Sequence, residues 1–229
     1  MPIIYVAGTD ITGDYSNTSP VLQEIARSCG LIIGEDRRNL GRFVAGTGVR
    51  DTEQMFLNEH SLDREKEFLL EVCGEHEKSL LISDAGTPCV ADPGYDFINM
   101  AWKAGCEIIS IPGPSSITAA LSVSGYFAES FHFMGFPPKD NDQRKKFIDR
   151  VHNHKDTVVL MERPYAVAQL MDEVAYIDKQ MSLSFNLGMP DEKTYRGKAK
   201  DIIKAIPADI KAPFVLVISK KRYKEDKKK

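Results

Sequence analysis

The sequence lacks the features that define several large protein classes. No apolar run approaches the roughly 18 residues that span a bilayer, and the opening MPIIYVAGTD has neither the basic nor the long apolar region of a signal peptide. The 16 glycines and 12 prolines among 229 residues are ordinary numbers, which excludes collagen-like and low-complexity chains. Hydrophobic residues make up 42% and charged residues 28%. The sequence therefore predicts a cytoplasmic globular protein of one or two domains.

Cysteine is scarce and is not arranged as a metal site. The four cysteines, Cys29, Cys73, Cys89 and Cys106, show no CxxC spacing and have no histidine at metal-ligand distance along the chain. Their neighbours are apolar or helical, which is typical of free, buried thiols in a reducing compartment. We therefore expect no metal site and no disulfide.

Two common catalytic signatures are also missing. There is no GxSxG elbow for a serine nucleophile and no GxxxxGK[ST] loop for a nucleotide triphosphate. The segment AGTG at 45–48 contains a GxG spacing, but it follows a predicted helix rather than a strand. The dinucleotide fingerprint requires a strand, a turn and a helix in that order, so this segment is not interpreted as one.

Charge is unevenly distributed. The formal net charge is −3, yet residues 219–229 hold seven basic and two acidic side chains, so the preceding 218 residues carry −8. An acidic body argues against a general nucleic-acid coat, whereas a basic end is able to contact phosphate. The alternative for this segment is a solvated terminus.

The first half alternates strands with helices. Helix-capping residues support the pattern: Thr18 or Ser19 before Pro20, Ser61 or Asp63 before the next helix, and Asp92 before Pro93. Alternation of this kind predicts a mostly parallel α/β sheet. The predicted strands are 3–6, 31–33, 80–83 and 107–111, and the predicted helices are 18–28, 61–73 and 93–103.

The second half is richer in strands, which predicts a mixed sheet and a second α/β domain. A Pro-Gly-Pro turn at 112–114 separates the halves and precedes a helix of small residues at 115–124. We expect an N-terminal domain at 1–113 and a C-terminal domain at 114–229 with a basic tail at 219–229. The predicted strands are 131–135, 157–161, 182–187, 194–196 and 213–219, and the predicted helices are 142–151, 165–174 and 198–205.

Polar and small residues follow two of the predicted strands. Asp84, Ala85, Gly86 and Thr87 come directly after one strand, where an open α/β sheet binds its ligands. Ser115, Ser116 and Thr118 follow the next strand at the start of a helix, where free amides and hydroxyls receive polar groups. Either segment alone is also explained as a strand-to-helix connection. Together they favour one small-molecule site.

Four motifs carry a family resemblance. They are EDRR at 35–38, LISDAGTPCVADPGY at 81–95, IPGPSSITAALSVSG at 111–125 and FMGFPP at 133–138. In order and spacing the chain resembles the ribosomal RNA small-subunit methyltransferase I family, part of the tetrapyrrole methylase superfamily. The resemblance implies an S-adenosylmethionine site between two α/β domains, a homodimer, and ribosomal RNA or the small ribosomal subunit as partner, with a ribose 2′-hydroxyl as acceptor.

The resemblance also implies roles for individual residues. Asp84 and Thr87 would hold the ribose or the amino-acid end of the cofactor, within a set that includes Ala85 and Gly86. Ser115 and Ser116 would contact the methionine moiety. The adenine would be walled by three apolar residues, which any fold could equally bury in its core; they are Met161, Leu187 and Phe214.

The methyl acceptor is less closely defined. Glu35, Asp36 and Asp14 are candidate general bases, although Glu35 or Arg38 could instead form a structural ion pair. The loop at 8–17 lacks the Pro-Ile-Gly-Asn run of the family, and the chain ends at 229, before the C-terminal extension of longer relatives. The alternatives are therefore a methylase of a tetrapyrrole or another small molecule, and a cofactor-binding relative without catalysis.

Overall fold

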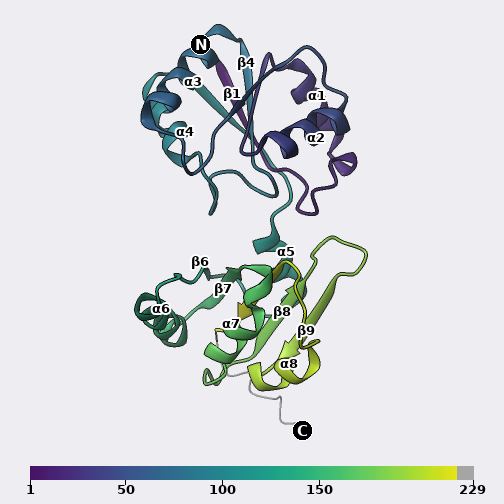
Figure 1. Cartoon of the computed structure of the whole chain (residues 1–229), viewed down its shortest axis with the longest axis vertical. Coiled ribbons are helices and arrows are strands. Elements are labelled where there is room, and N and C mark those ends of the chain that lie inside the picture. Colours follow the sequence, from purple (N-terminus) through teal and green to yellow (C-terminus); the bar gives the residue numbers. More distant parts are fainter. Residues whose placement is uncertain (221–229) are drawn as a thin grey trace. The chain divides into compact units, whose positions relative to one another are not determined.

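The computed structural model describes residues 1–220, which form two compact units (Figure 1). The first unit runs from Met1 to Ser115 and the second begins at Ser116. This division lies two residues after the boundary expected from the Pro-Gly-Pro turn. Most of the basic tail, including Lys221, Arg222 and Lys224, lies outside the described residues.

The first unit is built on a five-stranded parallel sheet in the order β3-β2-β4-β1-β5. All four residues of β2 are buried, as expected where helices cover both faces of a parallel sheet. The edge strand β3 was not predicted, because its sequence EQMF is half polar and three of its four residues are exposed. The strands are β1 (Ile3–Ala7), β2 (Leu31–Gly34), β3 (Glu53–Phe56), β4 (Lys78–Ile82) and β5 (Glu107–Ile111).

Two pairs of helices cover the two faces of this sheet (Figure 1). Because strand residues alternate between faces, Ile32 packs with Leu40 and Phe43 under α1 and α2, whereas Ile33 packs with Phe97 under α3 and α4. The predicted α/β class is therefore confirmed. The helices are α1 (Pro20–Ser28), α2 (Arg37–Thr47), α3 (Asp63–Glu75) and α4 (Tyr95–Lys103).

The start of α1 follows the sequence prediction. Ser19 is the N-cap residue, and its hydroxyl accepts a hydrogen bond of 3.2 Å from the backbone N–H of Leu22, with Pro20 in the first turn. This arrangement satisfies one of the amides that a helix start leaves without a partner.

Two other helix starts differ from the prediction. Helix α4 begins at Tyr95 rather than Pro93, because the chain turns at Gly94 with a φ of 116°, which glycine adopts without strain. Asp92 is therefore not its N-cap. Helix α3 is capped at Leu62, whose backbone N–H donates to the Glu65 carboxylate at 2.7 Å. Ser61 instead accepts a hydrogen bond from the backbone of the preceding loop.

The second unit has a mixed sheet in the order β6-β7-β10-β8-β9, in which only β6 and β7 run parallel. All five strands predicted for this half of the chain are present. The strands are β6 (Phe131–Gly135), β7 (Thr157–Glu162), β8 (Met181–Phe185), β9 (Lys193–Gly197) and β10 (Phe214–Ile218). The helices are α5 (Ser116–Ser124), α6 (Asn141–Asn153), α7 (Val167–Glu173) and α8 (Ala199–Ala205).

The two faces of the second sheet are packed differently. Residues of α6, α7 and α8 form one large core with alternate residues of the strands, including Leu183 of β8. Ser182 and Ser184 alternate with Leu183 and are fully buried on the other face, where α5 packs against β8, β9 and β10. Their small side chains, with Ala120 of α5, allow this helix to approach the sheet closely.

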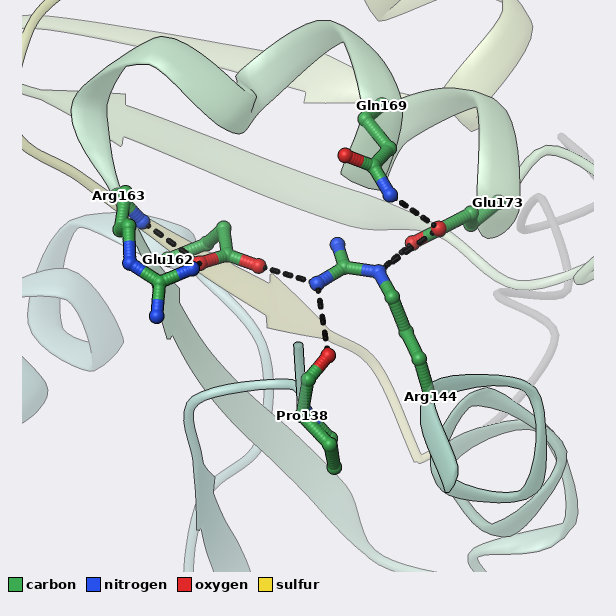
Figure 2. Close-up of polar contacts among 6 residues, drawn as sticks. All are labelled: Pro138, Arg144, Glu162, Arg163, Gln169 and Glu173. Atoms are coloured by element: carbon green, nitrogen blue, oxygen red, sulfur yellow. Dashed lines mark hydrogen bonds and ion pairs between the residues drawn. The ribbon is translucent and has the colours of Figure 1, made fainter. Parts of the chain in front are cut away.

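A buried ion network in the second unit centres on Arg144 of α6 (Figure 2). Its Nε donates to both carboxylate oxygens of Glu173 at 2.8 and 2.9 Å, and its Nη1 donates to Glu162 at 2.6 Å and to the Pro138 carbonyl at 3.4 Å. The Glu162 side chain is fully buried and that of Arg144 is 7% exposed. One guanidinium thus connects α6 and the loop before it to β7 and α7.

Candidate active site at the strand ends of the first sheet

The loops that follow β1 and β4 are fixed to each other at the carboxyl edge of the first sheet. The backbone N–H of Thr9 donates to Gly86 at 2.8 Å, and that of Gly86 donates to Thr9 at 3.2 Å. The Thr9 hydroxyl donates to the Ser83 carbonyl and the Ser83 hydroxyl to the Gly86 carbonyl, each at 3.0 Å. This edge, where the sequence predicted a ligand, is therefore a rigid platform.

Asp84 is held in place by three neighbours. Its backbone N–H donates to Glu35 Oε1 at 3.1 Å, and its carbonyl accepts from the Tyr15 hydroxyl at 2.8 Å. Its Oδ2 accepts from Asn39 Nδ2 at 2.7 Å. Oδ1 of the same carboxylate has no partner among the described residues, so one oxygen of a well-oriented carboxylate is left for a ligand.

Glu35 and Asp92 join Asp84 in an acidic group, and burial dominates the behaviour of both. Burial raises the pKa of Glu35 from 4.5 to about 7, with further increases from the charges of Asp92 and Asp84, while the Asp84 amide lowers it. Burial likewise raises the pKa of Asp92 to about 6, assisted by Asp84 and opposed by the Ser83 hydroxyl. Glu35 forms no ion pair with any residue from 1 to 220. Glu35 and Asp92 therefore change protonation near neutral pH, as a general base does.

Tyr15 is a buried residue whose hydroxyl donates to the Asp84 carbonyl. Its side chain is 4% exposed, and its ring packs edge-on against Phe43 with 5.7 Å between centroids. The Arg42 guanidinium lies 5.7 Å from the centre of the Tyr15 ring. Burial is the main cause that raises the pKa of Tyr15, followed by the charge of Asp84. The phenol therefore stays protonated and keeps donating to the Asp84 carbonyl.

Glycine is required where the loops after β1 and β5 meet. The backbone N–H of Gly8 donates to the Ile111 carbonyl at 3.3 Å. A Cβ added to Gly113 would lie 2.4 Å from the carbonyl oxygen of Gly8, closer than real contacts allow. The two loops thus approach each other too closely for any side chain at Gly113.

The other residues predicted near the cofactor are spread along the same edge and into the next helix. Ala85 and Thr87 are exposed, whereas Gly86 is buried with a φ of 89°. Ser115 is the last residue of the first unit and Ser116 the first residue of α5, and both are half-buried. The loop after Asp84 is therefore exposed at Ala85 and Thr87.

Two of the three candidate bases cap helices. Asp36 Oδ1 accepts from the backbone N–H of Arg38 at 2.9 Å and of Asn39 at 3.1 Å. Asp14 Oδ1 accepts from the hydroxyl of Ser16 at 2.6 Å and its N–H at 3.1 Å, and these bonds lower the pKa of Asp14. Glu35 alone among the three contacts Asp84.

The predicted adenine contacts in the second unit do not share one face. Phe214 is 4% exposed and packs against Phe185, with ring centroids 5.8 Å apart. Met161 is paired with Val215, the next residue, so strand alternation directs Met161 and Phe214 to opposite faces of the sheet. Leu187, in the turn after β8, is 8% exposed.

Asn39, Asp92 and Tyr15 are the members of the site that sequence reasoning missed. Asp92 was interpreted as a helix cap, and the glycine two residues later was the signal against that interpretation. Asn39 lies four residues after Glu35, in the first turn of α2. Tyr15 is the one aromatic residue in the polar loop 8–17. That isolated aromatic side chain is the signal by which it could have been identified as a buried residue.

Two further properties concern residues 1–220. Within them, no group of three or more His, Cys, Asp or Glu side chains is placed to hold a metal ion. None of the helices in this range has the length and apolar character required to cross a membrane.

Comparison with known proteins places this chain in a family. The family model of tetrapyrrole (corrin/porphyrin) methylases matches residues 5–203. A ribosomal RNA small subunit methyltransferase I from Leptospira borgpetersenii is 28% identical over 216 residues, which are 92% of this chain and 85% of the relative. One from Synechocystis is 29% identical over 223 residues, 96% of this chain and 79% of that protein.

A solved structure supports the fold. The crystal structure of uroporphyrin-III-C-methyltransferase from Thermus thermophilus matches 96% of this chain and 95% of its own, with a TM-score of 0.63 and 16% identity. At that identity the likeness concerns the fold alone. From the family match over most of its length, the chain belongs to the tetrapyrrole methylases and is a methyltransferase that uses S-adenosylmethionine as its methyl donor.

Proposed function

We propose that this methyltransferase acts on RNA of the small ribosomal subunit and that the acceptor is a ribose 2′-hydroxyl. Relatives over most of the chain are named ribosomal RNA small subunit methyltransferase I. The observation that carries the proposal is Glu35, an unpaired carboxylate with a pKa of about 7 beside Asp84. A hydroxyl is a poor nucleophile, and a carboxylate with this pKa is suited to take its proton at neutral pH.

In this proposal the strand ends of the first sheet hold the cofactor. The Asp84 Oδ1, which has no partner among residues 1–220, would accept from a ribose hydroxyl or an ammonium group, and the exposed residues Ala85 and Thr87 follow it along the chain. A Cβ on Gly86 would lie 3.6 Å from the Ile11 side chain and 3.9 Å from the Pro114 carbonyl oxygen, so the chain packs closely around this turn. The donor and acceptor chemistry therefore fits S-adenosylmethionine, which supplies an electrophilic methyl group when bound.

The remaining cofactor contacts are proposed on the family motif. Ser115 and Ser116 would bind the methionine moiety through backbone and hydroxyl groups. Leu187, Met161 and Phe214 stay predicted adenine contacts, but Met161 and Phe214 cannot contact one ring from the same side of the sheet. Substituting each to alanine and measuring cofactor affinity separates a ligand contact from a core residue.

Glu35 would act on the acceptor. As the hydroxyl oxygen bonds to the methyl carbon and the carbon–sulfur bond breaks, the hydroxyl proton would pass to the Glu35 carboxylate. The Asp84 amide holds Glu35 Oε1 at 3.1 Å and so orients the carboxylate. Glu35 Oε2 has no partner among residues 1–220 and is the oxygen proposed to take the proton.

The test is methyl transfer from labelled cofactor to unmodified small-subunit RNA. Glu35→Gln should lower kcat by about 10²- to 10⁴-fold and leave cofactor affinity within twofold. Glu24→Gln, an exposed site on α1, is the matched control and should keep the wild-type rate. A Glu35→Gln variant with more than half the wild-type rate would overturn the base, and cofactor binding without transfer to RNA would overturn the acceptor.

A small-molecule acceptor is the second candidate. The net charge of −8 over the first 218 residues favours it, because such a body repels a polyanion. The family description, which names corrin and porphyrin methylases, supports the same alternative. Transfer of label to a tetrapyrrole but not to RNA would establish it.

We further propose a homodimer that meets the small ribosomal subunit in the cytoplasm. The motivation is the family resemblance, since nothing in the composition bears on assembly. Light scattering at micromolar concentration should give twice the mass of one chain, and a mass of 25.6 kDa would contradict the dimer.

A further inference from the structure

A groove of about 730 Å³ runs along the edge of the first sheet, between β3 and the start of α3, outside the acidic group. Two phenylalanine rings form its apolar part: Phe56 is 36% and Phe68 57% exposed. Large exposed aromatic rings gathered in one hollow are unusual on a protein with no partner for them. The lining residues are Gln54, Met55, Phe56, Asn58, His60, Ser61, Arg64, Glu65 and Phe68.

The polar groups of the groove are able to recognise nucleotides. Gln54 carries an amide that both donates and accepts, and the Asn58 amide nitrogen donates while its Oδ1 accepts from the His60 backbone N–H at 2.9 Å; the edges of unpaired bases require such groups. These groups lie beside the rings, where a stacked base would present its edge.

Two arginines lie in or beside the groove. The Arg37 guanidinium lies 5.6 Å from the centre of the Phe56 ring, and Arg64 forms no ion pair with any described residue. The Glu65 carboxylate is occupied at the Leu62 backbone N–H. Glu59, a neighbouring carboxylate, places its Oε1 3.5 Å from Nε2 of His60 in the groove wall. Arg64 in the groove wall and Arg37 beside the Phe56 ring are therefore available to phosphate, while Glu65 keeps its negative charge at the start of α3.

The groove lies close to the acidic group. Phe56 pairs with Gly34 in the sheet, the Leu57 N–H donates to the Gly34 carbonyl at 2.9 Å, and Glu35 is the next residue. Asp84 follows β4, two strands from β3 and so about 10 Å across the sheet. That distance corresponds to about three stacked nucleotides, each rising about 3.4 Å.

We propose that this groove binds the unpaired RNA nucleotides that flank the methyl acceptor. Bases stack on Phe56 and Phe68, and Arg37 and Arg64 contact phosphates. The inference rests on the proposed function, because it requires an RNA substrate whose acceptor lies at Glu35. It extends that function in two ways. The RNA bound in the groove is single-stranded, and it runs along the edge of the sheet toward Glu35.

The test is direct binding of a fluorescent single-stranded RNA, with methyl transfer measured separately. Phe56→Ala and Phe68→Ala should each weaken RNA binding by about 5- to 100-fold, and Arg64→Gln should lower the salt slope by about 0.7. The matched controls are Trp102→Ala, 60% exposed on α4, and Arg50→Gln, also exposed. Cofactor affinity and melting temperature should not change in any variant.

The outcomes separate the two proposals. RNA binding that depends on the groove, without methyl transfer by the wild type, would support RNA binding by the groove and overturn both the proposed function and the placing of an acceptor at Glu35. Methyl transfer by the wild type with unchanged RNA binding in the groove variants would overturn only the groove. A change in the mass of the assembly caused by Phe68→Ala would show a subunit interface here and also overturn it.

Discussion

The two units bury carboxylates in opposite ways. In the second unit, Glu162 and Glu173 share one guanidinium, that of Arg144 (Figure 2). In the first unit, Glu35 and Asp92 have neither an ion pair nor any other cationic partner among the described residues, and their pKa values rise to about 7 and about 6. A paired buried carboxylate connects elements of structure, whereas an unpaired one becomes a proton acceptor near neutral pH.

The three carboxylates at the strand ends of the first sheet are an unfavourable arrangement, because they lie close together without a cationic partner among residues 1–220. Like charges at the strand ends reduce stability, and a protein keeps such groups together where its activity requires them. The hydrogen bonds of Asp84 to Tyr15 and Asn39 hold the group in place against that repulsion. Substitutions in the Arg144 network should therefore reduce stability, whereas substitutions at Asp84 and Glu35 should change cofactor binding and the pH dependence of stability.

The largest expected effect is on stability, from Arg144→Ala. Removing the guanidinium leaves the fully buried Glu162 with Arg163 alone, whose Nη1 lies 3.8 Å from Glu162 Oε1 and whose backbone N–H donates to it, and this should lower the free energy of unfolding by about 3 kcal/mol. Lys146→Ala, at an exposed site of the same helix, should change it by less than about 0.5 kcal/mol. Urea unfolding measures both. A loss below about 1 kcal/mol for Arg144→Ala would mean that the network is not structural.

The next effect is on cofactor binding, from Asp84→Ala. If Asp84 Oδ1 accepts a charge-assisted hydrogen bond, its loss should weaken S-adenosylmethionine binding about tenfold or more, equivalent to about 1.4 kcal/mol. Asp36→Asn, which retains an acceptor at the N-cap of α2, should leave the affinity unchanged. Calorimetric titration distinguishes the two, and an unchanged affinity in Asp84→Ala would remove that residue from the cofactor site.

The smallest effect is the dependence of stability on pH. Glu35 binds its proton more tightly in the folded chain, with a pKa of about 7 against 4.5. The free energy of unfolding should therefore fall as pH rises from about 4.5 to about 7, by about 1 kcal/mol after solvent screening. Glu35→Gln should flatten this part of the curve. A wild-type curve that rises over this range would contradict an unpaired Glu35.

Much of the fold follows from local sequence. Apolar runs such as LIIG in β2 and FVLVI in β10 are buried on both faces and therefore predict strands directly. Edge strand β3 lacks that signal, because an exposed strand needs few apolar residues. The start of α4 was misplaced because Asp92-Pro93 is a good local helix start, and the positive φ of Gly94 two residues later outweighs it.

The site could be predicted in part. Asp84 follows a buried strand, so its place at the carboxyl edge follows from the strand-helix alternation. The contribution of Asn39 and Tyr15 could not be predicted, because they reach Asp84 from 45 and 69 residues away along the chain. The sequence alone could not show which of Glu35, Asp36 and Asp14 is free to accept a proton. That depends on which of them cap helices, as Asp36 and Asp14 do in the structure.

The proposed catalytic role of Glu35 depends most directly on the protonation of its carboxylate. NMR titration of its side-chain carboxyl carbon, assigned by comparison with Glu35→Gln, measures that pKa in the intact chain. We predict a midpoint of about 7, with the carboxyl of Asp92 titrating at about 6. A Glu35 midpoint at or below 4.5 would show that the carboxylate is charged and stabilised, and would contradict its role as the base.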